Sequence, residues 1–289
     1  MSNLQLFVVA VAIWGSTWLA ITFQLGKVPP EASVTYRFLL ASLLIFGYCL
    51  VRRLPLRFAR REHLWIALMG GLMFSVSYIF VYYAEQHVVS GLVAVGYSAS
   101  PMLGLIGMRI FFGTPMTRLL VLGSILGMVG ITLVFWPEFS RLQGDRDTAL
   151  GALYTIIAVA VSALGSIAAQ RNSRVGFPLW QSLAWGMLYG AILSLAVTVV
   201  AGRPLHFEWT APYVLSLLYL TVLGSILAFA AYLTLLHRVG AARAGYIGVM
   251  VPIVALVISA AFEGFRWHAL TWAGIAVSVA GNVIVLRRN

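Results

Sequence analysis

The sequence predicts an all-α membrane protein with ten transmembrane helices, arranged as two inverted five-helix repeats around a central cavity. Its composition, its ten apolar runs and an internal similarity between its halves lead to this prediction. Of the 289 residues, 61% are apolar and only 9% are charged, and the mean hydropathy is +0.95. A soluble domain carries about a quarter charged residues because its surface faces water. Most of this surface is therefore expected to face lipid.

Ten runs are close to the length of about 20 mostly apolar residues that a spanning helix needs. Turn-forming pairs and glycines separate them, for example Pro29-Pro30, Gly113, Gly176 and Gly202. No basic residue precedes the first run, which is also longer than the apolar region of a typical secretory signal. We therefore expect it to remain as a helix. The expected helices are 4–25, 31–51, 64–86, 90–112, 118–136, 150–170, 180–201, 211–235, 241–262 and 268–287.

The loop charges predict the orientation. Most of the Lys and Arg residues fall on the side of the N-terminus, including five arginines within residues 52–61. Every acidic residue except Glu62 falls on the other side. Because Lys and Arg accumulate in cytoplasmic loops, we expect a multi-pass protein of the cell (inner) membrane with both termini in the cytoplasm.

An internal repeat links the two halves at an offset of 151 residues. Pro101 matches Pro252, Gly113 matches Gly264, and further glycines stay in register. The predicted organisation is a first repeat over 1–136, a linker over 137–149 and a second repeat over 150–289. Five helices in each repeat force the second to enter the membrane from the opposite side. Many transporters have such inverted repeats, although a duplication that merely built a bundle is the alternative.

Several function classes lack support in the sequence. The net charge of +11 comes from short clusters between apolar runs, so we expect no nucleic-acid partner. The lone cysteine, Cys49, and the five scattered histidines show no metal-ligand spacing, and no nucleotide-binding loop is present. We therefore expect no metal, no cofactor and no enzyme activity. An integral-membrane enzyme and a non-transporting membrane module remain the rivals from other classes.

Short motifs carry a resemblance to a known family. They include Trp14-Gly15-Ser16-Thr17, Arg37-Phe38, Ser90-Gly91, Glu263-Gly264 and the two mid-helix prolines. On these residues the chain resembles the EamA-type family of the drug/metabolite transporter superfamily. The resemblance covers nearly the whole chain and implies a ten-helix fold with a central cavity and export of amino acids or other metabolites. One departure is that Phe112-Gly113 stands in the first half where Glu263-Gly264 stands in the second.

Aromatic and hydroxyl side chains deep in the apolar runs are the candidate substrate ligands. A polar site lined by rings suits a ligand with an apolar or cationic part. For each residue, a buried ring with a satisfied polar group is the alternative. Together with Arg37, the substrate-binding candidates are Trp14, Ser16, Trp18, Tyr78, Tyr82, Tyr97, Ser100, Gln170, Trp185, Tyr232 and Tyr246.

Ionisable residues inside a membrane segment point to function by default. Arg37 is expected either to face inward, pairing with Glu85 or an anionic substrate group, or to extend to the interface. Glu85, His87 and Glu263 are the candidates for coupling transport to protons. Pro101 and Pro252, each near the middle of its run, are the expected hinges, with packing kinks as the alternative.

The predicted function is a secondary transporter, an exporter of a small amphipathic metabolite that works by alternating access. Facilitative or exchange uptake is the alternative within the same class. The expected partners are the small-molecule substrate, the lipid bilayer and, under the coupled alternative, protons. Small residues of the fifth and tenth runs, among them Gly123, Gly130, Gly274 and Gly281, predict close helix packing. That packing lies either within a monomer or between the protomers of a homodimer.

Overall fold

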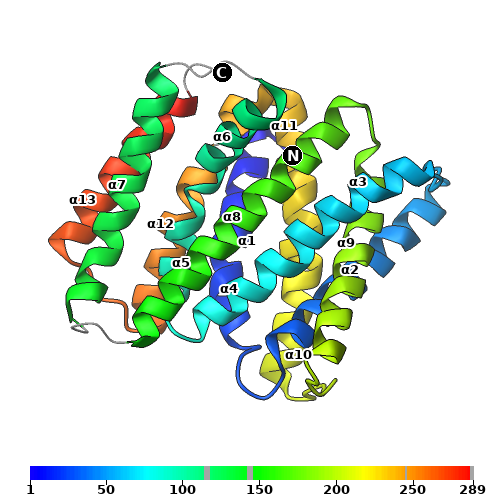
Figure 1. Ribbon diagram of the computed structural model, residues 1–289, viewed down its shortest axis with the longest axis horizontal. Coiled ribbons are helices and arrows are strands. Elements are labelled where there is room, and N and C mark those ends of the chain that lie inside the picture. The colour runs from blue at the N-terminus through cyan, green and yellow to red at the C-terminus, as the bar shows by residue number, and fades with distance from the viewer. Residues whose placement is uncertain (114–117, 142–145, 245, 287–289) are drawn as a thin grey trace.

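The computed structural model describes residues 1–113, 118–141, 146–244 and 246–286, and every regular element in these ranges is a helix. The helices lie side by side and form an elongated bundle (Figure 1). In chain order they are α1 (Asn3–Thr22), α2 (Pro30–Val51), α3 (Arg60–Gly71), η1 (Leu72–Val76), α4 (Ser77–Glu85), α5 (Ser90–Tyr97), α6 (Ser100–Phe112), α7 (Arg118–Arg141), α8 (Arg146–Arg174), α9 (Leu179–Val200), α10 (Ala211–Leu218), η2 (Tyr219–Leu227), α11 (Ala228–Ala244), α12 (Tyr246–Phe262) and α13 (Ala269–Leu286).

Six continuous helical segments are long and apolar enough to cross a membrane, which agrees with a multi-pass membrane protein. They are Asn3–Thr22, Pro30–Val51, Arg60–Glu85, Arg146–Arg174, Leu179–Val200 and Ala211–Tyr232. Shorter apolar helices cover Val121–Pro137, Met250–Phe262 and Ala269–Gly281.

The expected helix 90–112 is not continuous, which corrects the sequence prediction. Ser98 and Ala99 form a turn between α5 and α6, just before Pro101. Proline has no backbone N–H and disfavours the α conformation in the residue before it. Pro252, its counterpart in the second half, instead lies inside the continuous helix α12. The two expected hinges therefore differ in the backbone around them.

The expected linker 137–149 is largely helical where the structure describes it. α7 continues to Arg141, and α8 begins at Arg146.

Two wide π-helical segments interrupt the third and the eighth expected runs. η1 joins α3 to α4, and η2 joins α10 to α11. The repeat offset of 151 residues carries η1 onto residues 223–227, which lie within η2. π-Helical turns shift the hydrogen-bond ladder by one residue and occur often at functional sites.

Glycines bring α7 and α13 into close contact. A methyl group on Gly130 would lie 2.6 Å from the Gly274 carbonyl oxygen, and one on Gly281 would lie 2.5 Å from that of Gly123. Only residues without a side chain permit this approach. The glycine pattern therefore packs two helices of one chain, and Figure 1 shows this pair at one end of the bundle.

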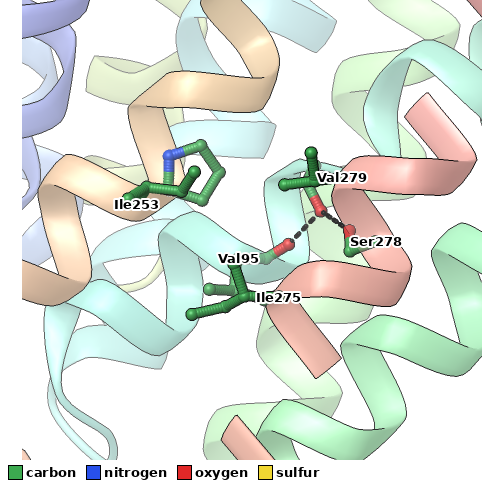
Figure 2. A pocket seen from close by; sticks show the side chains of 7 residues that line it. Val95, Ile253, Ile275, Ser278 and Val279 are labelled. Atoms are coloured by element: carbon green, nitrogen blue, oxygen red, sulfur yellow. Dashed lines mark hydrogen bonds between the residues drawn. The ribbon is translucent and has the colours of Figure 1, made fainter. Parts of the chain in front are cut away.

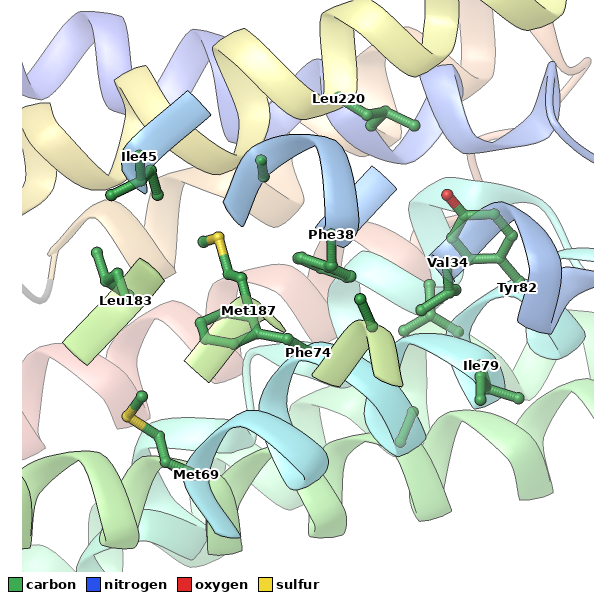
Figure 3. Packing of buried hydrophobic residues seen from close by; sticks show 14 of the residues in the cluster. Val34, Phe38, Ile45, Met69, Phe74, Ile79, Tyr82, Leu183, Met187 and Leu220 are labelled. Atoms are coloured by element: carbon green, nitrogen blue, oxygen red, sulfur yellow. The ribbon is translucent and has the colours of Figure 1, made fainter. Parts of the chain in front are cut away.

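The main apolar core lies where α2 and α9 meet the η1–α4 segment. Phe38, Phe74 and Met187 are buried there (Figure 3), and the rings of Phe38 and Phe74 are 5.3 Å apart. Phe38 follows Arg37 along α2, so this core fixes the helix that carries the buried arginine.

Candidate substrate-binding site

Arg37 is a buried cation near the middle of the helix bundle. Only 2% of its surface is exposed. Its guanidinium carbon lies 4.6 Å from the centroid of the Tyr78 ring and 5.1 Å from that of Phe38, and Nε donates a hydrogen bond to the Ser225 hydroxyl at 3.2 Å. Its Nη1 has no hydrogen-bond partner in the part of the chain that the structure describes. Arg37 therefore does not extend to the interface, and two ring faces and one hydroxyl only partly compensate its charge.

Glu85, the last residue of α4, is also buried, and neither of its carboxyl oxygens has a hydrogen-bond partner among the residues that the structure describes. Arg37 and Glu85 are close enough to interact electrostatically, but they do not form a direct ion pair. The direct ion pairs among the described residues are Lys27–Glu208 and His87–Asp147. The Arg37 guanidinium and the Glu85 carboxyl group thus lie in one buried region without direct contact, and Glu263 also interacts electrostatically with Glu85.

Tyr82 and Gln24 complete this group. Tyr82 is fully buried, its hydroxyl donates to Gln24 Oε1 at 2.7 Å, and it lies beside the Arg37 guanidinium. Gln24 Nε2 has no partner. We call Gln24, Arg37, Tyr78, Tyr82 and Glu85 the polar core. Unsatisfied donors and acceptors within one buried group cost free energy, and a solute with polar groups of both kinds would satisfy them.

Helix α1 borders the polar core through η2. The Trp14 indole N–H donates to the Gly224 carbonyl at 3.1 Å, and the Ser16 and Tyr219 hydroxyls are 2.6 Å apart. A methyl group on Gly224 would contact Thr17 at 2.8 Å and Arg37 Nη2 at 3.6 Å. The π-helical geometry exposes the Gly224 carbonyl to a side chain of another helix. η2 thereby brings α1 and α2 together at Arg37.

Aromatic rings of other helices pack against two tryptophans of α1. Trp14 lies 5.4 Å from Tyr232, and Trp18 lies 5.1 Å from Tyr97. The Tyr97 hydroxyl is 2.5 Å from that of Ser77. These predicted ligands therefore form two ring pairs, and the polar groups of Trp14 and Tyr97 already have protein partners.

Other predicted ligands do not join this group. The Trp185 indole donates to the Leu56 carbonyl at 3.0 Å and packs against His63, 4.9 Å away. It therefore holds the connection between α2 and α3. Gln170 is exposed near the end of α8. The side chains of Ser100, Pro101 and Tyr246 lie outside the described part of the chain.

The remaining coupling candidates have partners. His87 Nδ1 lies 3.2 Å from Asp147 Oδ1 at the exposed edge of the bundle. The Glu263 carboxylate accepts hydrogen bonds from the Ser90 backbone, the Ser90 hydroxyl and the Ser259 hydroxyl. Only Glu85 among the three lies buried beside Arg37.

Pro252 lines a cavity of about 20 Å³ together with Val95, Ser98, Ile253, Ile275, Ser278 and Val279 (Figure 2). The Ser98 hydroxyl donates to the Val95 carbonyl at 2.7 Å and lies 3.4 Å from Ser278 Oγ. A volume of this size holds about one water molecule. The cavity at this proline is therefore too small for a metabolite in this conformation.

Sequence reasoning did not identify Gln24, Gly224 or Ser225. Gly224-Ser225 inside a strongly apolar run was the available signal, because it repeats the Gly-Ser pair of residues 15 and 16. Within the described residues, no group of three His, Cys, Asp or Glu side chains could hold a metal ion.

These features define a multi-pass helical membrane protein with a charged and incompletely satisfied site among its helices. The chain belongs to the EamA-like transporter family, which matches residues 1–136 and 149–287. This confirms the family resemblance seen in the sequence.

Individual relatives agree with the family. The chain is 31% identical over 283 residues to the uncharacterized inner membrane transporter YedA of Escherichia coli K12, covering 94% of this chain and 87% of that protein. It is 22% identical to the uncharacterized transporter YoaV of Bacillus subtilis, covering 89% and 87%. A crystal structure of another protein matches with a TM-score of 0.70 and 18% identity over 100% of this chain and 99% of that one. That likeness concerns the fold alone.

Proposed function

We propose that this chain is a secondary transporter that exports a small amphipathic metabolite, such as an amino acid, by alternating access. The observation that carries the proposal is the polar core, in which Arg37 Nη1 and both Glu85 oxygens are buried without hydrogen-bond partners among the described residues. A zwitterion would place its carboxylate at Arg37 and its ammonium group at Glu85. Tyr78 and the rings near α1 would contact its apolar part.

The buried charges support a binding role over a structural one. A charged side chain at the centre of a membrane helix costs about 2.5–3.5 kcal/mol on insertion scales. A purely structural arginine would recover that cost through a direct carboxylate partner, and Arg37 lacks one among the described residues. A solute that supplies the missing partner gains binding energy from both groups.

Alternating access is supported by features that relate the two halves. The family matches the chain in two segments, and η1 and η2 correspond at the repeat offset. We therefore propose ten spans in two inverted repeats, with residues 1–136 and 150–289 as the units. The loop charges support cytoplasmic termini, and the direction of export rests on the family resemblance.

A screen followed by reconstitution tests this function. Cells that express the chain are challenged with toxic concentrations of amino acids and cationic compounds, and each compound that expression protects against is then measured in proteoliposomes. We expect accumulation of a zwitterionic compound at a rate that Arg37→Gln abolishes. Indifference to every small molecule in both assays would contradict transport.

A further inference from the structure

Glu263 joins the end of α12 to the beginning of α5. Its Oε1 accepts from the Ser90 backbone N–H at 3.1 Å, and its Oε2 accepts from the Ser90 hydroxyl at 2.6 Å. The Ser259 hydroxyl donates to the same Oε2 and accepts from the Gly91 backbone N–H at 2.8 Å. Ser259 of α12 and Glu263, which directly follows that helix, thus accept hydrogen bonds from the first two N–H groups of α5.

Helix α5 has no cap of its own. Its N-cap residue, Val89, makes no side-chain hydrogen bond. The first N–H groups of a helix need partners, and a carboxylate there is also favoured by the helix dipole. The beginning of α5 is therefore satisfied only while α12 stays in contact with it.

An apolar seal lies directly beneath these hydrogen bonds. Leu92, Val95, Leu256 and Phe265 are buried together in one cluster. A methyl group on Gly91 would lie 3.0 Å from the Leu256 Cα, so the two backbones are in close contact. The polar contacts and the seal close the α5–α12 junction at the end of the bundle opposite the termini, which is the lower end in Figure 1.

The equivalent positions of the other half carry no such polar groups. At the repeat offset of 151, Ser90 corresponds to Ala241, Ser259 to Met108 and Glu263 to Phe112. None of these three side chains can make a charge-assisted hydrogen bond. The three hydrogen-bonding side chains of this junction therefore have apolar residue types at the equivalent positions of the other half.

We propose that Ser90, Ser259 and Glu263 form a latch that holds α5 against α12 and makes closure at this end the resting conformation of the transporter. Glu263 is a positioning residue, because among the described residues its hydrogen bonds go to Ser90 and Ser259 and not to the polar core, although it interacts electrostatically with Glu85. The inference rests on the proposed function, since alternating access requires this junction to open. The apolar residue types at positions 108, 112 and 241 cannot supply these three hydrogen-bonding groups to the opposite closure, and this inequality biases the equilibrium between the two states.

Cysteine accessibility tests the latch. Cys49 is the chain's one cysteine and is fully buried, so Cys49→Ser provides the background. Leu92→Cys reports on the seal, and Ile66→Cys, on the buried face of α3, reports on general loosening. A membrane-impermeant maleimide is added from the latch side of membrane vesicles without substrate.

We expect Glu263→Gln to increase the labelling rate of Leu92→Cys by at least about tenfold, because hydrogen bonds to charged groups contribute about 1.5–3 kcal/mol. Ser259→Ala should give a smaller increase in the same direction. Glu208→Gln is the matched control, since it removes a carboxylate that pairs with Lys27 in loops at the same end, and should change nothing. The rate for Ile66→Cys should stay at background in all variants.

Two results would overturn the latch. One is an unchanged rate for Leu92→Cys in Glu263→Gln. The other is an equal rise for Leu92→Cys and Ile66→Cys, which would show that Glu263 only stabilises the fold. The labelling assay needs no substrate, so it tests the latch separately from transport. If no transport is found but Glu263→Gln still speeds the labelling of Leu92→Cys, the proposed function is contradicted while the latch contacts still control opening of the junction. Normal transport with unchanged labelling contradicts the latch alone.

Discussion

Glu85 and Glu263 are two carboxylates whose surroundings differ in one decisive respect. Glu263 receives one backbone N–H and two hydroxyl donors, whereas Glu85 receives no donor among the described residues. Glu85 is the last residue of α4, and Glu263 directly follows the last residue of α12, so position along the chain hardly distinguishes them. The two residues differ in the hydrogen bonds that their carboxyl oxygens accept.

The difference separates holding the structure from binding a solute. A carboxylate whose oxygens already accept hydrogen bonds from the protein stabilises the fold through those bonds. It has no free acceptor site to offer a ligand. A buried carboxyl group and a buried arginine that lack hydrogen-bond partners are desolvated, and no direct contact with the protein offsets the free-energy cost. The polar core therefore has binding energy available for a solute, while the latch controls access to it.

The largest expected effect is that of Arg37→Gln. Transport of the identified solute should fall by about a hundredfold, which corresponds to about 2.7 kcal/mol of lost interaction. The thermal midpoint should not fall, because removing an incompletely paired buried charge relieves its desolvation cost. Proteoliposome uptake and thermal unfolding in detergent measure the two quantities. Lost transport accompanied by a markedly lower midpoint would make Arg37 a structural residue.

Glu85→Gln should be next in size. If protons couple to transport through this group, uptake driven by a pH gradient should fall by about tenfold or more, because the amide cannot exchange a proton. Solute exchange without a gradient should be less affected. Both are measured in inverted vesicles, with Glu208→Gln as the control for loss of a carboxylate. Gradient-driven uptake equal to that of the unmodified protein would remove Glu85 from coupling.

Ser225→Ala removes the hydrogen-bond acceptor of Arg37 Nε and leaves the cation in place. We expect KM to rise by up to about tenfold, since a hydrogen bond to a charged group contributes about 1.5 kcal/mol or more. Ser216→Ala is the matched control, because that buried hydroxyl bonds only to the Tyr213 carbonyl within its own helix. Equal KM values for the two variants would argue against a positioning role for Ser225.

The smallest effects are expected from substitutions at two tryptophans, Trp14 and Trp185, which are compared with each other. Trp14→Phe loses the hydrogen bond to Gly224 beside Arg37 and should lower transport by about fivefold, since one neutral hydrogen bond contributes about 1 kcal/mol. Trp185→Phe loses an equivalent hydrogen bond to the Leu56 carbonyl. Among the described residues, the hydrogen-bond and ring contacts of Trp185 do not include a residue of the polar core. The transport rate of Trp185→Phe should stay within about twofold of that of the unmodified protein. Its free energy of unfolding should decrease by about as much as that of Trp14→Phe, because each variant loses one hydrogen bond. Identical transport losses would extend the site to α9.

Much of the helical framework could be predicted from the sequence, because lipid imposes length and apolarity on each span. Glycines at the predicted separators adopt positive φ at Gly113, Gly176, Gly202 and Gly264, as their turn chemistry indicated. The π-helical segments and the break at Ser98 could not be predicted. They depend on how neighbouring helices pack, which hydropathy does not record.

The candidate site shows the same division. Arg37 stood out because a charge inside a span is rare, and Tyr78 and Tyr82 share a helix face through their spacing of four. The partners Gln24 and Ser225 belong to residue types too common to be singled out. Trp185 and Trp14 look alike in sequence, and only the tertiary contacts separate the ring beside Arg37 from the ring that holds a loop.

The most direct test of the polar core compares the identified zwitterion with its carboxamide analogue, which lacks the anionic group. The ratio of kcat/KM for the two compounds is measured in proteoliposomes with the unmodified protein and with Arg37→Gln. We predict a preference of at least about tenfold for the carboxylate in the unmodified protein, the size expected for one charge-assisted hydrogen bond, and a ratio near one in Arg37→Gln. An unchanged ratio would contradict the assignment of Arg37 as the group that binds the solute's carboxylate.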